Sequence, residues 1–296
     1  MSVLYRENFN VEFRIVDFES WTPNNVNDLC ELTDQLSSLV RPNDPEIALG
    51  FTVHTDPTTF GCSQDFTRAV VIPDNGSFSE ADIELHIAHE LGHLFGGWHL
   101  PITNSVMYGF GPTPSHTSFD QFNKQAILLM RNFDFYKGVE GIDGPSVERF
   151  TTIYNEGPHF PEVVNPISEA YDRLGNQLAR EGNYDEAIID YRKAVSIDPQ
   201  NAQAHWNYGV IAERNRQLTS LASTEFLAAA TQYLHRADKY VAQENDKGHA
   251  WLAICQAAPA ASTAQSLDPS NLQAAAILQT LSDRRATICP TCVCPR

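Results

Sequence analysis

The chain has 296 residues, of which 42 % are hydrophobic, and its 37 acidic and 20 basic residues give a net charge of −17. This length is large for a single compact core and accommodates two domains. The acidic excess argues against nucleic acid and anionic membrane surfaces as main partners, because both are themselves negatively charged.

The sequence contains no run of the roughly 20 apolar residues that span a bilayer. The stretch MSVLYRENFNVEFRIVDFES lacks the basic region, apolar core and small-residue cleavage site of a secretory signal, so we expect a cytoplasmic protein. Six cysteines are either dispersed or crowded near the C-terminus, which is not the pattern of a small secreted domain: Cys30, Cys62, Cys255, Cys289, Cys292 and Cys294.

Strand and helix patterns alternate in the first part of the chain, which favours an α+β domain. Apolar and polar residues alternate over 10–18, which predicts a half-buried strand. Apolar residues recur at helical spacing over 26–40. The apolar runs 46–54 and 68–73 predict two further strands, and the composition of 55–67 predicts a loop between them.

A helix is predicted at 81–95, because apolar residues again recur at helical spacing. Ser79 and Asp82 have the pattern of a capping box at its start. A loop rich in Gly, Pro, Ser and Thr follows, and a further helix is predicted at 119–133. Residues 137–166 are rich in proline and glycine, and we interpret them as a linker.

The rest of the chain is helical and repetitive. Within 168–201, residues of matching type stand at Tyr171, Leu174, Gly175, Leu178, Ala187, Tyr191, Ala194 and Pro199. With these residues the segment resembles one unit of the tetratricopeptide repeat (TPR), whose period is about 34 residues. The small residues Gly175 and Ala187 would let the two helices of the unit cross closely.

A second unit follows more loosely, a third within 231–270 has drifted, and a final helix is expected near 271–285. We therefore expect an all-α, TPR-like helical repeat domain at 167–286, followed by a Cys-rich tail at 287–296. Three tail cysteines are one short of a closed Cys₄ zinc site.

The resemblance to TPR units implies a groove for a protein or peptide partner. Asn176 and Asn207 stand where such repeats hold a peptide backbone, so we predict them as groove residues. Asp172 occupies a place that is basic in repeats that clamp a carboxylate, which argues against that type of ligand. The alternative is that the helices only brace the domain before them.

The segment HELGHLFGGWH, residues 89–99, holds three histidines. His89 and His93 would share one face of a helix, since residues four apart differ by only about 40° in azimuth. A continuing helix would rotate His99 away from them by about 240°. Gly96 and Gly97 can end the helix, because glycine accepts the left-handed conformation, and the chain can then return His99 to the same ion.

Three imidazoles with an adjacent carboxylate suit one catalytic zinc ion. Zinc favours nitrogen ligands in a tetrahedron, and catalytic sites leave the fourth position to water. The metal lowers the pKa of that water to about 7. Glu90 follows the first ligand and has the chemistry of a general base.

The pattern His89-Glu90-x-x-His93-x-x-Gly96-x-x-His99 resembles the metzincin signature, and Ser105-Val106-Met107-Tyr108 resembles the Met-turn that follows it. The spacing is similar to that of matrixins and archaemetzincins, although archaemetzincins have cysteines where this chain has Leu100 and Ser105. The resemblance implies a metzincin-like catalytic domain at 1–136, in which a mixed sheet accompanies the active-site helix.

The same resemblance assigns roles to single residues. His89, His93 and His99 would be the zinc ligands and Glu90 the general base. Gly96 would permit the turn and Met107 would form an apolar floor, while 108–118, beginning with Tyr108, would form one wall of the substrate pocket.

Together these patterns predict a zinc-dependent metalloendopeptidase that hydrolyses a protein or peptide substrate, with TPR-like repeats for protein binding. The alternative is a non-catalytic scaffold whose zinc site is structural or vestigial, or a histidine-rich helix end without metal. Met107 would then be an ordinary core residue and Tyr108 a filler. His86 is more readily a supporting or surface residue than a ligand. Further possibilities are a Cys30–Cys62 disulfide and a tail thiolate that covers the zinc.

Overall fold

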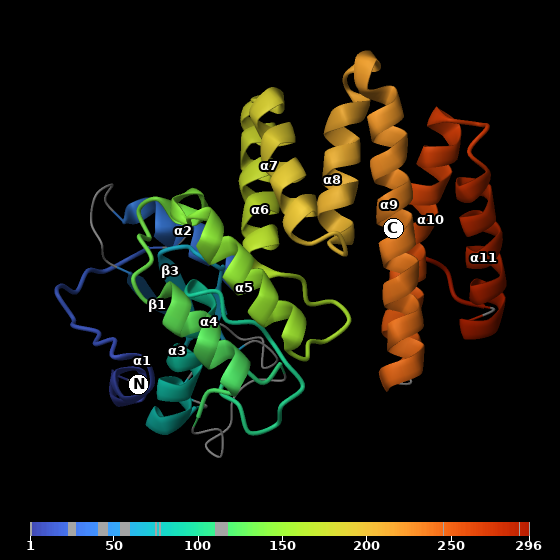
Figure 1. Ribbon diagram of the computed structural model, residues 1–296. Helices are drawn as coiled ribbons and strands as arrows, with labels where there is room; N and C mark the ends of the chain where they lie inside the picture. Colours follow the sequence, from blue (N-terminus) through green and yellow to red (C-terminus); the bar gives the residue numbers. More distant parts are fainter. Residues whose placement is uncertain are drawn as a thin grey trace. The chain divides into compact units, whose positions relative to one another are not determined.

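A computed structural model describes residues 2–22, 28–40, 47–53, 60–74, 76, 78–109, 118–244, 246–289 and 291–295 (Figure 1). The chain divides into two compact units, Met1–Ile167 and Ser168–Arg296. Within the described ranges, none of the helices combines the length and apolarity that a bilayer crossing requires.

The first unit contains a small mixed sheet in the order β1-β3-β2. Strand β1 (Ala48–Thr52) runs parallel to the central strand β3 (Ala69–Pro73), and β2 (Cys62–Ser63) pairs antiparallel with β3. All residues of β3 are buried because both its edges are paired and helices α2 and α3 pack against it. The two predicted strands and the mixed sheet are confirmed. Strand β2 lies in the stretch expected as a loop, of which 55–59 fall outside the described residues.

The described part of this unit also contains six helical segments, of which Figure 1 labels the five α-helices. They are α1 (Ser2–Phe9), α2 (Leu29–Leu39), α3 (Glu80–Leu94), α4 (Gln121–Met130), the 3-10 segment η1 (Gly138–Gly141) and α5 (Gly144–Glu156). Helix α3 begins with the predicted capping box, in which Ser79 and Asp82 exchange side-chain and backbone hydrogen bonds. Together these helices and the sheet confirm the α+β character of the first unit.

The strand predicted at 10–18 is wrong. These residues form no regular structure, and the side chains of Ile15, Val16 and Phe18 are exposed. A strand needs a partner for its backbone groups, and the described sheet holds only the three strands above. The backbone of 10–18 therefore has no strand partner in the described sheet, although the Phe13 ring packs on Tyr5.

The interpretation of 137–166 as a linker is also wrong, because helix α5 packs into the first unit. Asp143 caps the helix by accepting a hydrogen bond from the backbone of Ser146, and a proline occupies its first turn. Phe150 is fully buried, with its ring against those of Phe66 and Trp98. The glycines and prolines of this segment thus mark a helix start and turns within a folded unit.

The second unit is all-α, as predicted. Its helices are α6 (Pro166–Glu181, whose first residues close the first unit), α7 (Tyr184–Ile197), α8 (Ala202–Glu213), η2 (Arg216–Leu218), α9 (Thr219–Lys239), the π-helical turn η3 (Tyr240–Glu244), α10 (Lys247–Leu267) and α11 (Leu272–Ile288). Helices α6 and α7 cross at Gly175, where a Cβ atom would lie 2.8 Å from the Tyr191 ring. This close approach confirms the reason given for the small residue.

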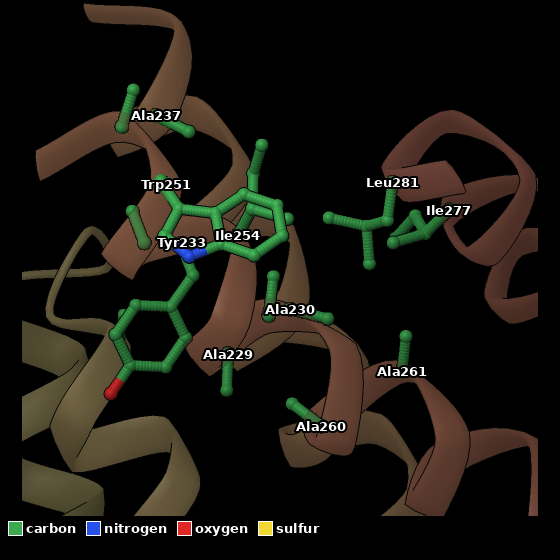
Figure 2. Packing of buried hydrophobic residues seen from close by; sticks show 14 of the residues in the cluster. Ala229, Ala230, Tyr233, Ala237, Trp251, Ile254, Ala260, Ala261, Ile277 and Leu281 are labelled. Carbon is green, nitrogen blue, oxygen red and sulfur yellow. The ribbon is translucent and has the colours of Figure 1, made fainter. Parts of the chain in front are cut away.

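The core between α9, α10 and α11 is built largely from alanine (Figure 2). The cluster includes Ala229 and Ala230 on α9 and Ala260 and Ala261 on α10, and small residues of this kind let helix backbones approach closely. The larger aromatic side chains of Tyr233, Tyr240 and Trp251 belong to the same cluster, and Figure 2 shows Tyr233 and Trp251 near the alanines. These small residues explain how α9 and α10 pack as a helix pair although the sequence of the third repeat departs from the TPR pattern.

Candidate metal centre

The three histidines of the HELGHLFGGWH segment come together. The Nε2 atoms of His89 and His99 lie 3.0 Å apart, those of His93 and His99 3.2 Å, and those of His89 and His93 3.3 Å. His89 is buried and the other two are half-buried. This group can hold a metal ion.

His99 reaches the other two because α3 stops at Leu94. Gly96 adopts a φ of +78°, and its N–H donates to His93 O while the Gly97 N–H donates to Gly92 O. These two bonds form a Schellman motif, which turns the chain back at a helix end. A Cβ atom at Gly96 would lie 2.5 Å from the Phe66 ring, so both conformation and space favour glycine here.

Backbone carbonyls orient two of the three imidazoles. Nδ1 of His89 donates to Val106 O and Nδ1 of His93 donates to Gly97 O, both at 2.7 Å. A carbonyl can only accept, so these partners assign the proton to Nδ1 and the lone pair to Nε2. Asp65 adds a carboxylate oxygen 3.8 Å from His93 Nδ1. Acceptors of this kind fix the tautomer and ring direction of metal-binding histidines.

The three imidazoles are neutral at neutral pH. Burial, with a smaller effect of His99, lowers the pKa of His89 to about 3. Burial and the neighbouring rings hold the pKa of His93 well below its usual range. The pKa of His99 is also lowered by burial, although the charge of Glu162 opposes the shift. Metal binding requires imidazole in this neutral form.

The facing nitrogens fit a zinc ion. Oriented lone pairs with no proton between them repel one another, and a cation among them would remove that repulsion. A tetrahedral zinc with Zn–N bonds of about 2.0–2.1 Å places its nitrogen ligands about 3.3–3.4 Å apart. The observed separations of 3.0–3.3 Å are close to this value. Imidazole also suits copper, iron and nickel, so the three donors could hold any of these ions.

Glu90 lies beside the first of these histidines with its side chain buried. The Ser63 hydroxyl is 2.7 Å from Glu90 Oε2 and 2.9 Å from the Glu90 carbonyl oxygen. Burial raises the pKa of Glu90 to about 7, and the hydrogen bonds from Ser63 oppose this rise. A carboxyl group with a pKa near neutrality can both take up and release a proton.

Met107 lies against α3 next to the histidines. Its side chain is fully buried, and a Cβ atom at Gly92 would lie 2.5 Å from its sulfur. The Tyr108 N–H donates to Ser105 O, which closes a turn around Met107. This turn lies in the segment 105–108 for which the Met-turn was expected, and its role there stays a prediction. Of the substrate wall predicted at 108–118, half-buried Tyr108 is described, whereas 110–117 lie outside the described residues.

Several neighbours of the centre carried no recognisable signal in the sequence. Ser63 and Asp65 belong to the segment 55–67, whose composition predicts a loop, and Glu162 belongs to 137–166, whose composition predicts a linker. The carbonyl of Val106 carries no signal because every residue has one. His86, in contrast, is buried rather than at the surface, lies outside the ligand group, and packs against the rings of Phe60 and Phe78.

In the second unit, Asn176 and Asn207 both contact Asp172. Asn207 Nδ2 donates to the two carboxylate oxygens at 3.0 and 3.1 Å, and Asn176 Nδ2 donates to Oδ2 at 3.2 Å. Tyr191 donates to the amide oxygen of Asn176. The two predicted groove residues are thus brought together, with their amide groups bound within one partly buried network, and the amide oxygen of Asn207 also accepts from Gln203.

The cysteines are paired as Cys30–Cys62, Cys255–Cys294 and Cys289–Cys292. The pairing considered for Cys30 and Cys62 is therefore present. No cysteine is free, so the hypothesis of a tail thiolate over the zinc is wrong.

Comparison with known families identifies the TPR repeat, whose model matches residues 175–215, from within α6 to just beyond α8. This match and the paired helices agree with the TPR-like character expected of the second unit. The comparison with curated proteins gives no match.

Proposed function

We propose that this protein is a zinc-dependent metalloendopeptidase with Glu90 as its general base. The observation that carries the proposal is the combination of three converging imidazoles with a buried, hydrogen-bonded carboxylate on the same helix. The metzincin-like spacing of 89–107 and the turn around Met107 support the same reaction.

His89, His93 and His99 would hold the ion. Zinc bound in such a site polarises the substrate carbonyl and lowers the pKa of a water molecule. Glu90 accepts a proton from the attacking water and passes it to the amine that leaves when the peptide bond breaks. The carbonyls of Val106 and Gly97 keep the ligand rings oriented throughout.

The TPR-like unit supplies protein binding in this proposal. Its similarity to the TPR repeat family supports a protein partner, since such helical pairs offer surfaces for peptides. The partner could be a substrate or a protein that recruits the peptidase.

The second candidate is a scaffold protein with a structural metal site, and the match to the TPR repeat favours it. The ligand count favours the enzyme. Structural zinc sites are closed by four protein ligands. Among the described residues the ligand group contains three histidines.

The test joins metal analysis with cleavage of an unstructured protein, for the wild type and for Glu90→Ala. Zinc in both proteins with cleavage by the wild type alone is the expected result. Zinc in both without cleavage by either would favour the scaffold. A wild type that binds no zinc would overturn both candidates.

A further inference from the structure

We propose that Ser63 is a positioning residue, whose hydroxyl holds the Glu90 carboxylate in place on the edge strand β2. The proposal rests on the proposed function, because it assigns Ser63 a part in the work of the general base. Three features carry it: the hydrogen bonds between the two residues, the chemistry of a hydroxyl, and the anchoring of β2.

The Ser63 hydroxyl contacts both the carboxylate and the backbone carbonyl of Glu90. Its Oγ lies 2.7 Å from Oε2 and 2.9 Å from the backbone oxygen of the same residue. The same hydroxyl therefore lies between the carboxylate at the tip of the Glu90 side chain and the main-chain oxygen at its base. Glutamate has several rotatable bonds, and burying it in one rotamer costs conformational entropy. The Ser63 contact selects that rotamer.

A hydroxyl suits this task because it both donates and accepts. The Ser63 O–H can donate to a Glu90 oxygen, and its own oxygen can accept a hydrogen bond, from one position between the carboxylate and the backbone carbonyl of Glu90.

Strand β2 is held firmly enough to act as a support. Ser63 is in register with Val70 of β3. The adjacent Cys62 is bonded to Cys30 of α2, and its carbonyl oxygen lies 3.2 Å from the Thr33 hydroxyl, which also lies 2.9 Å from Leu29 O within α2. On the other side of Cys62, a Cβ atom at Gly61 would lie 2.8 Å from Glu90 Cγ and Oε1.

The strand thus fits closely around the carboxylate. Glycine at position 61 leaves room for the Glu90 side chain, and serine at 63 binds it. Positions 61 and 63 flank Cys62 in an extended chain and so share one face, and the Glu90 side chain lies against both of them.

The experiment compares steady-state cleavage by four single variants with that of the wild type, together with zinc content and melting temperature. Ser63→Ala removes the hydroxyl, whereas Ser63→Thr keeps it. Ser63→Val has nearly the shape of the threonine variant without the hydroxyl, so Thr and Val form a matched pair. Thr33→Val is the structural control, because it removes a hydrogen bond to β2 that does not touch Glu90.

Ser63→Ala and Ser63→Val are expected to lower kcat about 10- to 100-fold with KM within about twofold, since a misplaced base slows the chemistry more than binding. Ser63→Thr is expected to recover kcat, and Thr33→Val to resemble the wild type. Zinc content should be the same in all five proteins.

Equal kcat for Ser63→Thr and Ser63→Val would overturn the positioning role, and it would do so even if Ser63→Ala failed to fold. A comparable loss in Thr33→Val, with lowered zinc content or melting temperature, would show that the strand matters only structurally. If the wild type binds zinc without cleaving, the proposed function fails and the role of Ser63 fails with it. If the wild type cleaves and Ser63→Ala equals it, the role of Ser63 fails alone.

Discussion

His89 and His99 place their Nε2 atoms 3.0 Å apart although the helix that carries His89 ends before His99 is reached. The contact exists because Gly96 and Gly97 reverse the chain with two backbone hydrogen bonds. The metal centre therefore depends on how α3 terminates as much as on the ligands themselves.

Substituting Gly96 should weaken zinc binding without altering a ligand. Gly96→Val would force a β-branched residue into a φ of +78° and against the rings of Phe66 and Phe150. Strain of this kind costs about 1–3 kcal/mol. We expect zinc affinity to fall by about one to two orders of magnitude, measured by competition with a chromophoric chelator.

The control for that measurement is Gly138→Val. Gly138 also has a positive φ, but a Cβ atom there would meet nothing within 4 Å. The Gly138→Val variant should be less stable than the wild type because of backbone strain, and its zinc affinity should be unchanged. Equal zinc affinity in Gly96→Val and the wild type would show that the helix end does not position His99.

Removing the metal should lower the stability of the first unit. A ligand that binds only the folded state at about 1,000 times its Kd contributes about 4 kcal/mol. A strong chelator should therefore lower the melting temperature of the zinc-loaded wild type. His93→Ala should melt at a temperature that the chelator does not change. A chelator effect of equal size in both proteins would place the stabilising metal elsewhere.

The buried carboxylate of Asp172 should make the second unit less stable as pH rises. Burial, opposed by the bonds from Asn207 and Asn176, raises the pKa of Asp172 to about 6. A raised pKa means that the folded state favours the protonated form, so this stability is present below about pH 4 and is lost as pH rises through about 6. The shift corresponds to at most about 3 kcal/mol.

Asp172→Asn should remove this dependence. The variant is expected to gain more stability over the wild type at pH 8 than at pH 5 in urea unfolding, because the penalty for the charge is only partly present at pH 5 and is complete above the folded-state pKa of about 6. Asp185→Asn alters an exposed carboxylate in the same unit and serves as the control. A gain that is the same at both pH values would contradict the assignment.

The Cys30–Cys62 disulfide should stabilise the first unit substantially. It joins residues 32 positions apart, and closing a loop of that length contributes about 3–4 kcal/mol in the chain-entropy description. Replacing both cysteines with serine should lower the unfolding free energy by about this amount. Before any reduction, a thiol assay of the unfolded protein should detect no free thiol. Six reactive thiols in protein purified without reductant would contradict the pairing.

These disulfides bear on the expected location. The cytoplasm of most organisms keeps cysteines reduced, whereas disulfides form and persist in oxidising compartments. Three disulfides in one chain are therefore typical of a protein outside the cytoplasm. The thiol assay therefore also tests the expectation of a cytoplasmic protein.

Features determined by a few neighbouring residues could be predicted from the sequence. The capping box of α3, the turn at Gly96 and the crossing at Gly175 each depend on local chemistry that the residue types reveal. The His89, His93 and His99 group belongs to the same class, because one helix and its end bring the three residues together.

Features that depend on distant partners could not be predicted. Among the described residues, the segment 10–18 has no neighbouring strand with which its backbone pairs. The segment 137–166 is rich in glycine and proline, yet it contains helix α5, which packs on Phe66 and Trp98 through Phe150. Ser63 contacts Glu90 only because β2 pairs with β3. No local pattern distinguishes that serine from the others in the chain.

Val106 and Gly97 orient the ligand rings through their main-chain oxygens. A substitution at Val106 changes a side chain and leaves its main-chain oxygen in place, provided the backbone keeps its path. A substitution at Gly97 does not, because a Cβ atom there would lie 2.9 Å from Gly92 O. The orientation of the His89 ring therefore places no demand on the side chain at position 106 through this hydrogen bond. The orientation of the His93 ring, in contrast, depends on a glycine at position 97, so the two ligand rings differ in how freely the sequence around them can change.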